Sequence, residues 1–146
     1  MEVIDPEKAA LVWQRVRGGT PRALAAELEE LIAGEWADAA AYLKLSRQFS
    51  GKEAGILYRM FQQEQSHAAC LKGIYTMLTG QKMVARHASP AGKNKEQALR
   101  SCYGREMHCL ARYEQHADHP EFGAVFARLA QEEREHCLKL LELLGR

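Results

Sequence analysis

Residues 61–71, FQQEQSHAACL, place a carboxylate and an imidazole within an apolar helical pattern. Glu64 and His67 are three residues apart, so on a helix their side chains lie on one face and can reach the same point. Phe61 and Leu71 fall on that face too. Because a buried carboxylate is costly unless a partner compensates its charge, this stretch predicts a buried helix whose polar groups meet a partner elsewhere in the chain.

The length and charge of the chain exclude several classes of partner. Its 146 residues are enough for one domain with a real core, which we expect over residues 1–146. The 20 basic and 19 acidic residues give a net charge of +1 with no basic block, so we expect neither nucleic acid nor a membrane surface as a partner. No apolar run approaches the roughly 18 residues of a membrane span, and the N-terminus does not resemble a signal peptide. These features predict a cytoplasmic protein.

The four cysteines form no Cys-x-x-Cys pair. A zinc knuckle, a thioredoxin-like motif and a rubredoxin-type iron site are therefore not encoded. In a reducing compartment we expect small buried thiols, because free cysteine packs as a small hydrophobe.

Start and stop signals divide the chain into one short and four long helical segments. Asp5-Pro6 and a Gly-Gly pair bound a short helix within residues 1–19. Ser50 and Glu53 suggest a capping box before the second long helix, and His119-Pro120 suggests the start of the fourth. The expected long helices cover residues 21–49, 51–80, 94–116 and 120–145.

Apolar residues recur at helical spacing in the long segments, which predicts an all-α fold. Four amphipathic helices of roughly 25 residues, each about 40 Å long, form a four-helix bundle over residues 20–146. The first and third connections are short enough for antiparallel hairpins. The second, residues 81–93, has 13 residues and is long enough at about 3.3 Å per residue to cross the length of the bundle.

A second Glu-x-x-His occurs in residues 131–141, QEEREHCLKLL, as Glu133 and His136. One such pair carries little weight, because a chain with 16 Glu and 6 His contains roughly 0.7 by chance. The stronger signal comes from the helix that precedes each pair.

Both preceding helices carry a glutamate followed seven residues later by a tyrosine. Residues 34–43, GEWADAAAYL, contain Glu35 and Tyr42, and residues 105–113, REMHCLARY, contain Glu106 and Tyr113. Each glutamate also stands 27 to 29 residues before the glutamate of the next helix, which in a hairpin places the two at similar height. The sequence therefore indicates an internal duplication of a helical hairpin.

In a bundle, four carboxylates and two imidazoles would converge inside the core. Without compensation they would cost more than the roughly 5 to 15 kcal/mol of stability of a whole domain. Two divalent cations balance four carboxylates in charge, and neutral imidazoles serve as nitrogen ligands. The predicted metal ligands are Glu35, Glu64, His67, Glu106, Glu133 and His136.

With these motifs the chain resembles the ferritin-like superfamily, most closely its rubrerythrin and bacterioferritin branch, over residues 21–145. The resemblance implies a di-metal centre, since a Glu from each of two helices and a Glu-x-x-His from each of the others is the ligand set of such bundles. It implies that Glu64 and Glu133 bridge the metals, while Glu35 and Glu106 are terminal ligands. His67 and His136 would each bind one metal.

The same resemblance implies roles for two tyrosines and differs from rubrerythrin at one position. Tyr42 and Tyr113 match tyrosines that hydrogen-bond ligand carboxylates, although simple core packing is an equal alternative. Rubrerythrins carry a further glutamate where this chain has Cys109, which we expect to be core filler rather than a ligand or redox group. Asp38 holds the matching place after Glu35, where we expect it either to lie at the core boundary or face solvent, or to act as a supplementary ligand or proton relay.

The function that these features imply is an oxidoreductase with two iron ions, or iron and manganese, per chain. It would reduce peroxide or dioxygen and be re-reduced by an external donor such as a rubredoxin-like protein, and we expect a homodimer. Zinc is also possible in purified protein, because this ligand set accepts Fe, Mn and Zn. Two alternatives stay open: an iron-storage protein with ferroxidase activity, and a metal-free helical binding module.

Overall fold

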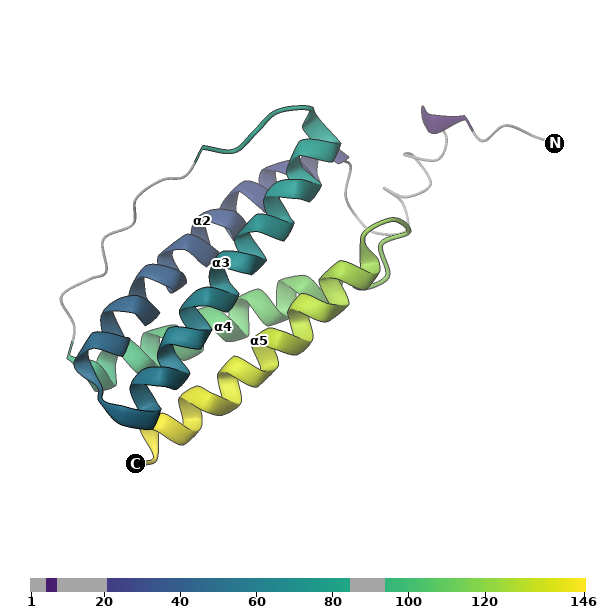
Figure 1. The fold of residues 1–146 in the computed structure, drawn as a ribbon. Helices are drawn as coiled ribbons and strands as arrows, with labels where there is room; N and C mark the ends of the chain where they lie inside the picture. Colours follow the sequence, from purple (N-terminus) through teal and green to yellow (C-terminus); the bar gives the residue numbers. More distant parts are fainter. Residues whose placement is uncertain (1–4, 8–20, 85–93) are drawn as a thin grey trace.

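The computed structural model describes residues 5–7, 21–84 and 94–146, and Figure 1 shows its four long helices. These are α2 (Pro21–Gln48), α3 (Gly51–Thr79), α4 (Lys95–Gln115) and α5 (Gly123–Leu144). The all-α four-helix bundle is confirmed, and the described residues contain no strand. Of the helix expected within residues 1–19, only residues 5–7 are described; the rest lies outside the described residues.

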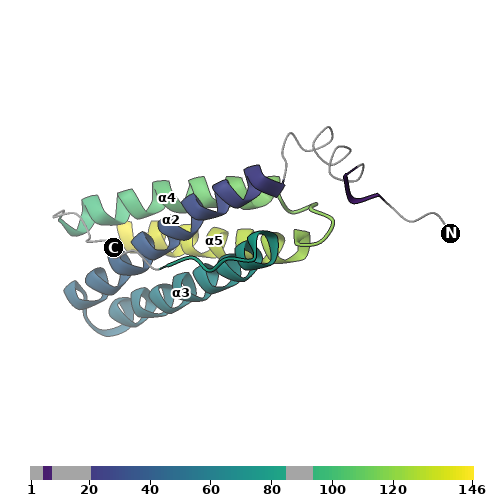
Figure 2. The ribbon, with the colours of Figure 1, turned by 90° about the horizontal axis from the view of Figure 1, so that it is seen from above.

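The helices pair as two hairpins whose faces pack together. α2 packs against α3 and α4 against α5, and the hairpins meet through α2 with α4 and α3 with α5. Figures 1 and 2 show that α3 ends and α4 begins at opposite ends of the bundle, so these two helices run parallel. The crossover arrangement follows from the positions of these helix ends; residues 85–93 of the connection lie outside the described residues. No helix among the described residues is long and apolar enough to span a membrane.

The start of α4 is closed by a capping box that involves Asn94 and Gln97. The Asn94 side chain accepts a hydrogen bond from the Gln97 backbone N–H at 2.8 Å, and the Gln97 side chain accepts one from the Asn94 N–H at 3.3 Å. The capping box predicted at Ser50 is wrong. Ser50 is the residue before α3 but its side chain makes no capping bond, and Glu53 instead accepts a hydrogen bond from Arg146 at 2.5 Å.

These two helix starts give a matched pair of substitutions. We expect Asn94→Ala to lower the free energy of unfolding by about 1 kcal/mol, because it leaves a helix-terminal N–H without its acceptor. That loss corresponds to a melting temperature lower by about 2–4 °C. Ser50→Ala, which removes no capping bond, should shift melting by much less. Equal shifts in the two variants, measured by thermal circular dichroism, would contradict this assignment.

α5 begins at Gly123, three residues later than a start at Pro120 predicts. The preceding residues form a turn in which His119 Nδ1 accepts hydrogen bonds from the backbone N–H groups of Glu121 and Phe122, at 3.1 and 3.0 Å. The His119 imidazole thus takes the place of the backbone carbonyl oxygens to which these two N–H groups would donate within a helix. The turn also brings its own backbone close to α5, since a Cβ on Gly123 would lie 2.5 Å from the Ala117 carbonyl oxygen.

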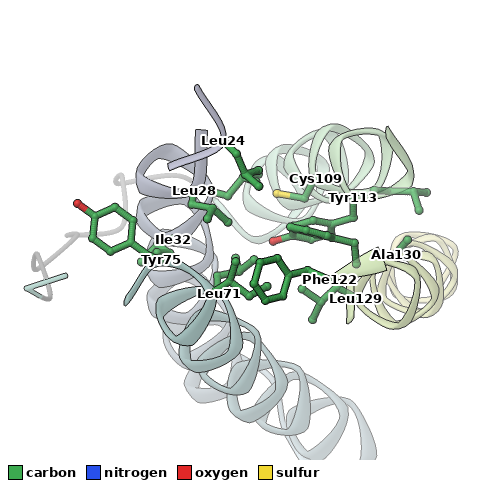
Figure 3. Packing of buried hydrophobic residues seen from close by; sticks show 14 residues of the cluster. Leu24, Leu28, Ile32, Leu71, Tyr75, Cys109, Tyr113, Phe122, Leu129 and Ala130 are labelled. Carbon is green, nitrogen blue, oxygen red and sulfur yellow. The ribbon is translucent and has the colours of Figure 1, made fainter. Parts of the chain in front are cut away.

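The apolar core consists of two clusters along the bundle axis. Figure 3 shows the first, where residues of all four helices meet and the Tyr113 hydroxyl points inward. On α2 this cluster ends at Ile32, and the second cluster begins at Tyr42. On α5 the clusters are likewise separated, between Ala130 and Leu140. A layer of buried polar residues therefore lies between two apolar clusters.

Candidate metal centre

All six predicted ligands lie in this middle layer, and each is at most 2% exposed. Every helix contributes to it. α2 and α4 each contribute one glutamate, while α3 and α5 each contribute a Glu-x-x-His pair with both side chains on one face. The residues are Glu35, Glu64, His67, Glu106, Glu133 and His136.

The six side chains form two overlapping groups, each of which could hold a metal ion. One contains Glu35 and His67, and the other contains Glu106 and His136. Glu64 and Glu133 belong to both. Within each group the candidate ligand atoms lie within 4.8 Å of one another, close to the roughly 4.2 Å that separates opposite ligands around one ion with bonds of about 2.1 Å.

The distances within the two groups are nearly the same. His67 Nδ1 lies 2.7 Å from Glu133 Oε1 and 3.5 Å from Glu35 Oε2. His136 Nδ1 lies 2.7 Å from Glu64 Oε1 and 3.4 Å from Glu106 Oε1. Each imidazole therefore comes closest to the shared glutamate of the opposite hairpin. This approximate two-fold symmetry is what a duplicated hairpin predicts.

A metal fits this layer because its polar atoms are buried without hydrogen bonds. Both oxygens of Glu64 and Glu133, one oxygen each of Glu35 and Glu106, and both histidine Nδ1 atoms have no hydrogen-bond partner in the described part of the chain. The 2.7 Å contacts of the imidazoles are close approaches that lack hydrogen-bond geometry. Orphaned atoms of this kind, gathered in two groups, could hold a metal ion.

The electrostatics of the carboxylates show the same need for positive charge. Burial, followed by the negative charge of Glu35, raises the pKa of Glu64 well above its usual range. Burial also opposes ionisation of Glu35, but the neighbouring Glu64 carboxyl group and His67 lower its pKa overall. The protein alone cannot keep all these groups charged at low cost, whereas divalent ions can.

The two tyrosines hydrogen-bond to carboxylates of the opposite hairpin. Tyr42 on α2 donates to Glu106 Oε1 on α4 at 2.6 Å, and Tyr113 on α4 donates to Glu35 Oε1 on α2. Burial, followed by the charge of the facing glutamate, raises the pKa of each phenol well above its usual range, so both remain donors. Each tyrosine therefore holds one of these glutamates in place, in addition to packing in the core.

Two further residues orient the imidazoles, and they are absent from the sequence-based prediction. His67 Nε2 lies 2.9 Å from Glu132 Oε2, and His136 Nε2 lies 2.7 Å from Gln63 Oε1. A hydrogen bond donated by Nε2 leaves the Nδ1 lone pair free to bind a metal. The sequence holds a signal for both, because each residue immediately precedes the glutamate of a Glu-x-x-His motif.

Glu132 and Gln63 make the two halves of the centre different, because His67 faces a carboxylate whereas His136 faces an amide. A carboxylate makes the bound imidazole the stronger ligand. We expect Glu132→Gln to weaken metal binding at the His67 position by about 10- to 100-fold and to leave the His136 position unchanged. Anaerobic calorimetric titration with Mn(II) would resolve the two steps. Exposed Glu135 on the same helix provides the control Glu135→Gln, which should change neither step; an equal loss in both variants would contradict the assignment.

Asp38 lies beside the centre but belongs to neither metal group. It is 1% exposed and accepts a hydrogen bond from Arg105, so the expectation that it lies at the core boundary or faces solvent is wrong. Burial, followed by the charge of Glu106, raises the pKa of Asp38 to about 7 despite Arg105. The reason is tertiary: Arg105 comes from α4, and it compensates a carboxylate that the packing of α2 against α4 buries.

Cys109, at the equivalent position on α4, is buried in the first apolar cluster. Burial raises the pKa of its thiol far above the usual range, so the sulfur remains protonated and is a poor ligand. The structure thus agrees with core packing for this residue.

Comparisons with protein-family models, with curated proteins and with solved structures found no match.

Proposed function

We propose that this protein is a di-metal carboxylate oxidoreductase of the ferritin-like type, which reduces peroxide or dioxygen. The observation that supports the proposal is the pair of overlapping ligand groups, in which Glu64 and Glu133 are shared. Two shared carboxylates would hold two ions side by side, an arrangement that suits two-electron chemistry on a small oxidant. Carboxylate and imidazole ligands suit iron and manganese.

In the iron form, two Fe(II) ions would supply the two electrons that, with two protons, convert one hydrogen peroxide molecule into two water molecules. The chain itself does three things. Its carboxylates and imidazoles hold the ions between two apolar clusters that exclude bulk water. Tyr42 and Tyr113 keep the terminal carboxylates oriented, and Glu132 and Gln63 keep each imidazole in the tautomer that binds metal.

After oxidation the metal ions must be reduced again before the next cycle. We propose a small electron-transfer protein as the donor of these electrons. We also propose that the protein is a homodimer.

Iron storage is the second candidate, because the same ligand shell can oxidise Fe(II) ahead of mineral deposition. Size-exclusion chromatography with light scattering separates them, since storage requires a large hollow assembly and the oxidoreductase does not.

The test uses full-length protein loaded anaerobically with two equivalents of Fe(II). We expect two ions per chain by elemental analysis and, on rapid mixing with hydrogen peroxide, oxidation of two Fe(II) per peroxide consumed. Reduction by a supplied donor should then permit a second cycle. Protein that binds no stoichiometric metal would instead support a helical binding module, and binding without reaction would rule out the oxidoreductase.

A further inference from the structure

A pocket of about 90 Å³ lies between α2 and α4. Its lining includes Gly34 and Asp38 on α2, and Arg105 and Cys109 on α4. Gly34 and Arg105 each directly precede a terminal carboxylate of the metal centre, while Asp38 and Cys109 follow the same carboxylates by one helical turn. This cavity, the α2–α4 pocket, therefore lies within one helical turn of Glu35 and Glu106, although neither carboxylate lines it.

The opposite side of the centre is occupied by side chains. Between α3 and α5, Glu132 and Gln63 are hydrogen-bonded to the outer nitrogens of the two imidazoles. Both bonds join one hairpin to the other, so an approach from that side would have to break them. Gly34 has no side chain, and a Cβ placed on it would meet no heavy atom within 4 Å. The α2–α4 side is therefore where a small molecule meets a cavity rather than a hydrogen-bonded pair.

The pocket also contains a buried acceptor that neither metal group explains. Asp38 uses Oδ1 for Arg105, but its Oδ2 has no hydrogen-bond partner in the described residues. Asp38 is 1% exposed and is not a member of either ligand group. A buried carboxylate oxygen without a donor carries a desolvation cost, which an occupant that donates a hydrogen bond would remove.

Size and charge restrict the occupant. About 90 Å³ corresponds to roughly three water molecules at about 30 Å³ each, well below the roughly 300 Å³ at which pockets for organic ligands begin. The lining charges are balanced, with Glu30 and Asp38 against Arg105 and Arg112, so the pocket offers no surplus of negative charge to a third metal cation. Among small oxidants, hydrogen peroxide donates hydrogen bonds to a carboxylate oxygen, whereas dioxygen donates none.

We propose that the α2–α4 pocket binds hydrogen peroxide beside the metal centre, with Asp38 Oδ2 accepting a hydrogen bond from the peroxide. Arg105 positions Asp38, and the gap at Gly34 admits the molecule. The inference rests on the proposed function and selects peroxide rather than dioxygen as the oxidant that the chain recognises.

Gly34→Leu tests the route with little risk to the fold, because the new side chain extends into open space and leucine favours helix over glycine. Gly104→Leu is the matched control: Gly104 is an exposed residue of α4 with no heavy atom within 4 Å of its would-be Cβ. Asp38→Ala removes the acceptor and leaves the pocket open. All four proteins, including the wild type, should bind two metal ions per chain.

The first measurement needs no turnover. Zinc-loaded protein, which is redox-inert, is titrated with hydrogen peroxide while the backbone amide signals of Gly34, Asp38 and Arg105 are followed by NMR. We expect saturable shifts in the wild type and in Gly104→Leu, and none in Gly34→Leu or Asp38→Ala. Absence of saturable shifts in the wild type would overturn the proposal.

The second measurement is the oxidation rate of the Fe(II)-loaded proteins. Gly34→Leu should react with peroxide at least 10-fold more slowly than Gly104→Leu, because leucine fills the route. Asp38→Ala leaves the route open, so it should react with peroxide at least 10-fold more slowly than the wild type while its rate with dioxygen stays within about two-fold. Equal peroxide rates in Gly34→Leu and Gly104→Leu, or equal slowing of Asp38→Ala with both oxidants, would overturn the peroxide site and leave the proposed function standing. Loss of metal binding in the wild type would instead overturn the proposed function.

Discussion

Glu64→Gln is expected to reduce the metal content from two ions per chain to at most one. Glu64 belongs to both ligand groups, and glutamine provides neither the second oxygen nor the charge that a shared ligand needs. The metal-free variant should be at least as stable as the metal-free wild type, because an amide of the same shape replaces a carboxylate that is buried without hydrogen bonds. Elemental analysis and thermal unfolding of the metal-free proteins give the two readouts.

A lower metal content together with an unchanged or higher stability of the metal-free protein distinguishes a ligand from a structural residue. A glutamate that mattered only for packing would lower stability when replaced and leave the metal content unchanged. Glu135→Gln again provides the exposed control, and it should alter neither quantity. Two ions per chain in Glu64→Gln would show that the ligand assignment is wrong.

Metal binding is expected to raise the melting temperature by about 10–20 °C. An ion present at 100 times its dissociation constant stabilises the folded chain by about 2.7 kcal/mol, and each kcal/mol corresponds to about 2–4 °C in a chain of this size. Two ions therefore give the stated range. The physical source is the layer of Glu35, Glu64, Glu106 and Glu133, whose charges oppose one another until cations lie between them. Scanning calorimetry with and without Fe(II), Mn(II) or Zn(II) measures the shift.

The double variant Glu64→Gln/Glu133→Gln is the control for this prediction. It lacks both shared ligands, so its melting temperature should be nearly independent of metal. A wild type whose melting does not respond to any of the three metals would contradict the metal centre. An equal response in the double variant would place the bound metal elsewhere in the chain.

Much of this architecture could be predicted from local sequence patterns. The limits of α2, α3 and α4 agree with the prediction within one or two residues, because they follow from proline, glycine and apolar periodicity. The predicted start of α5 at Pro120 is wrong because the backbone N–H groups of Glu121 and Phe122 donate to the His119 side chain rather than to helical carbonyl groups. The capping box at Ser50 was wrong because Glu53 pairs with Arg146, which is 93 residues away in the sequence.

The sequence by itself determined which residues form the polar layer. Spacing of three within Glu-x-x-His and of seven between glutamate and tyrosine places side chains on one helix face, whatever the helix packs against. Only the tertiary structure decided how those faces meet: that Glu64 and Glu133 are shared, that Glu132 and Gln63 orient the imidazoles, and that Arg105 partners a buried Asp38. The physical reason is that these contacts join different helices, whose register no local pattern encodes.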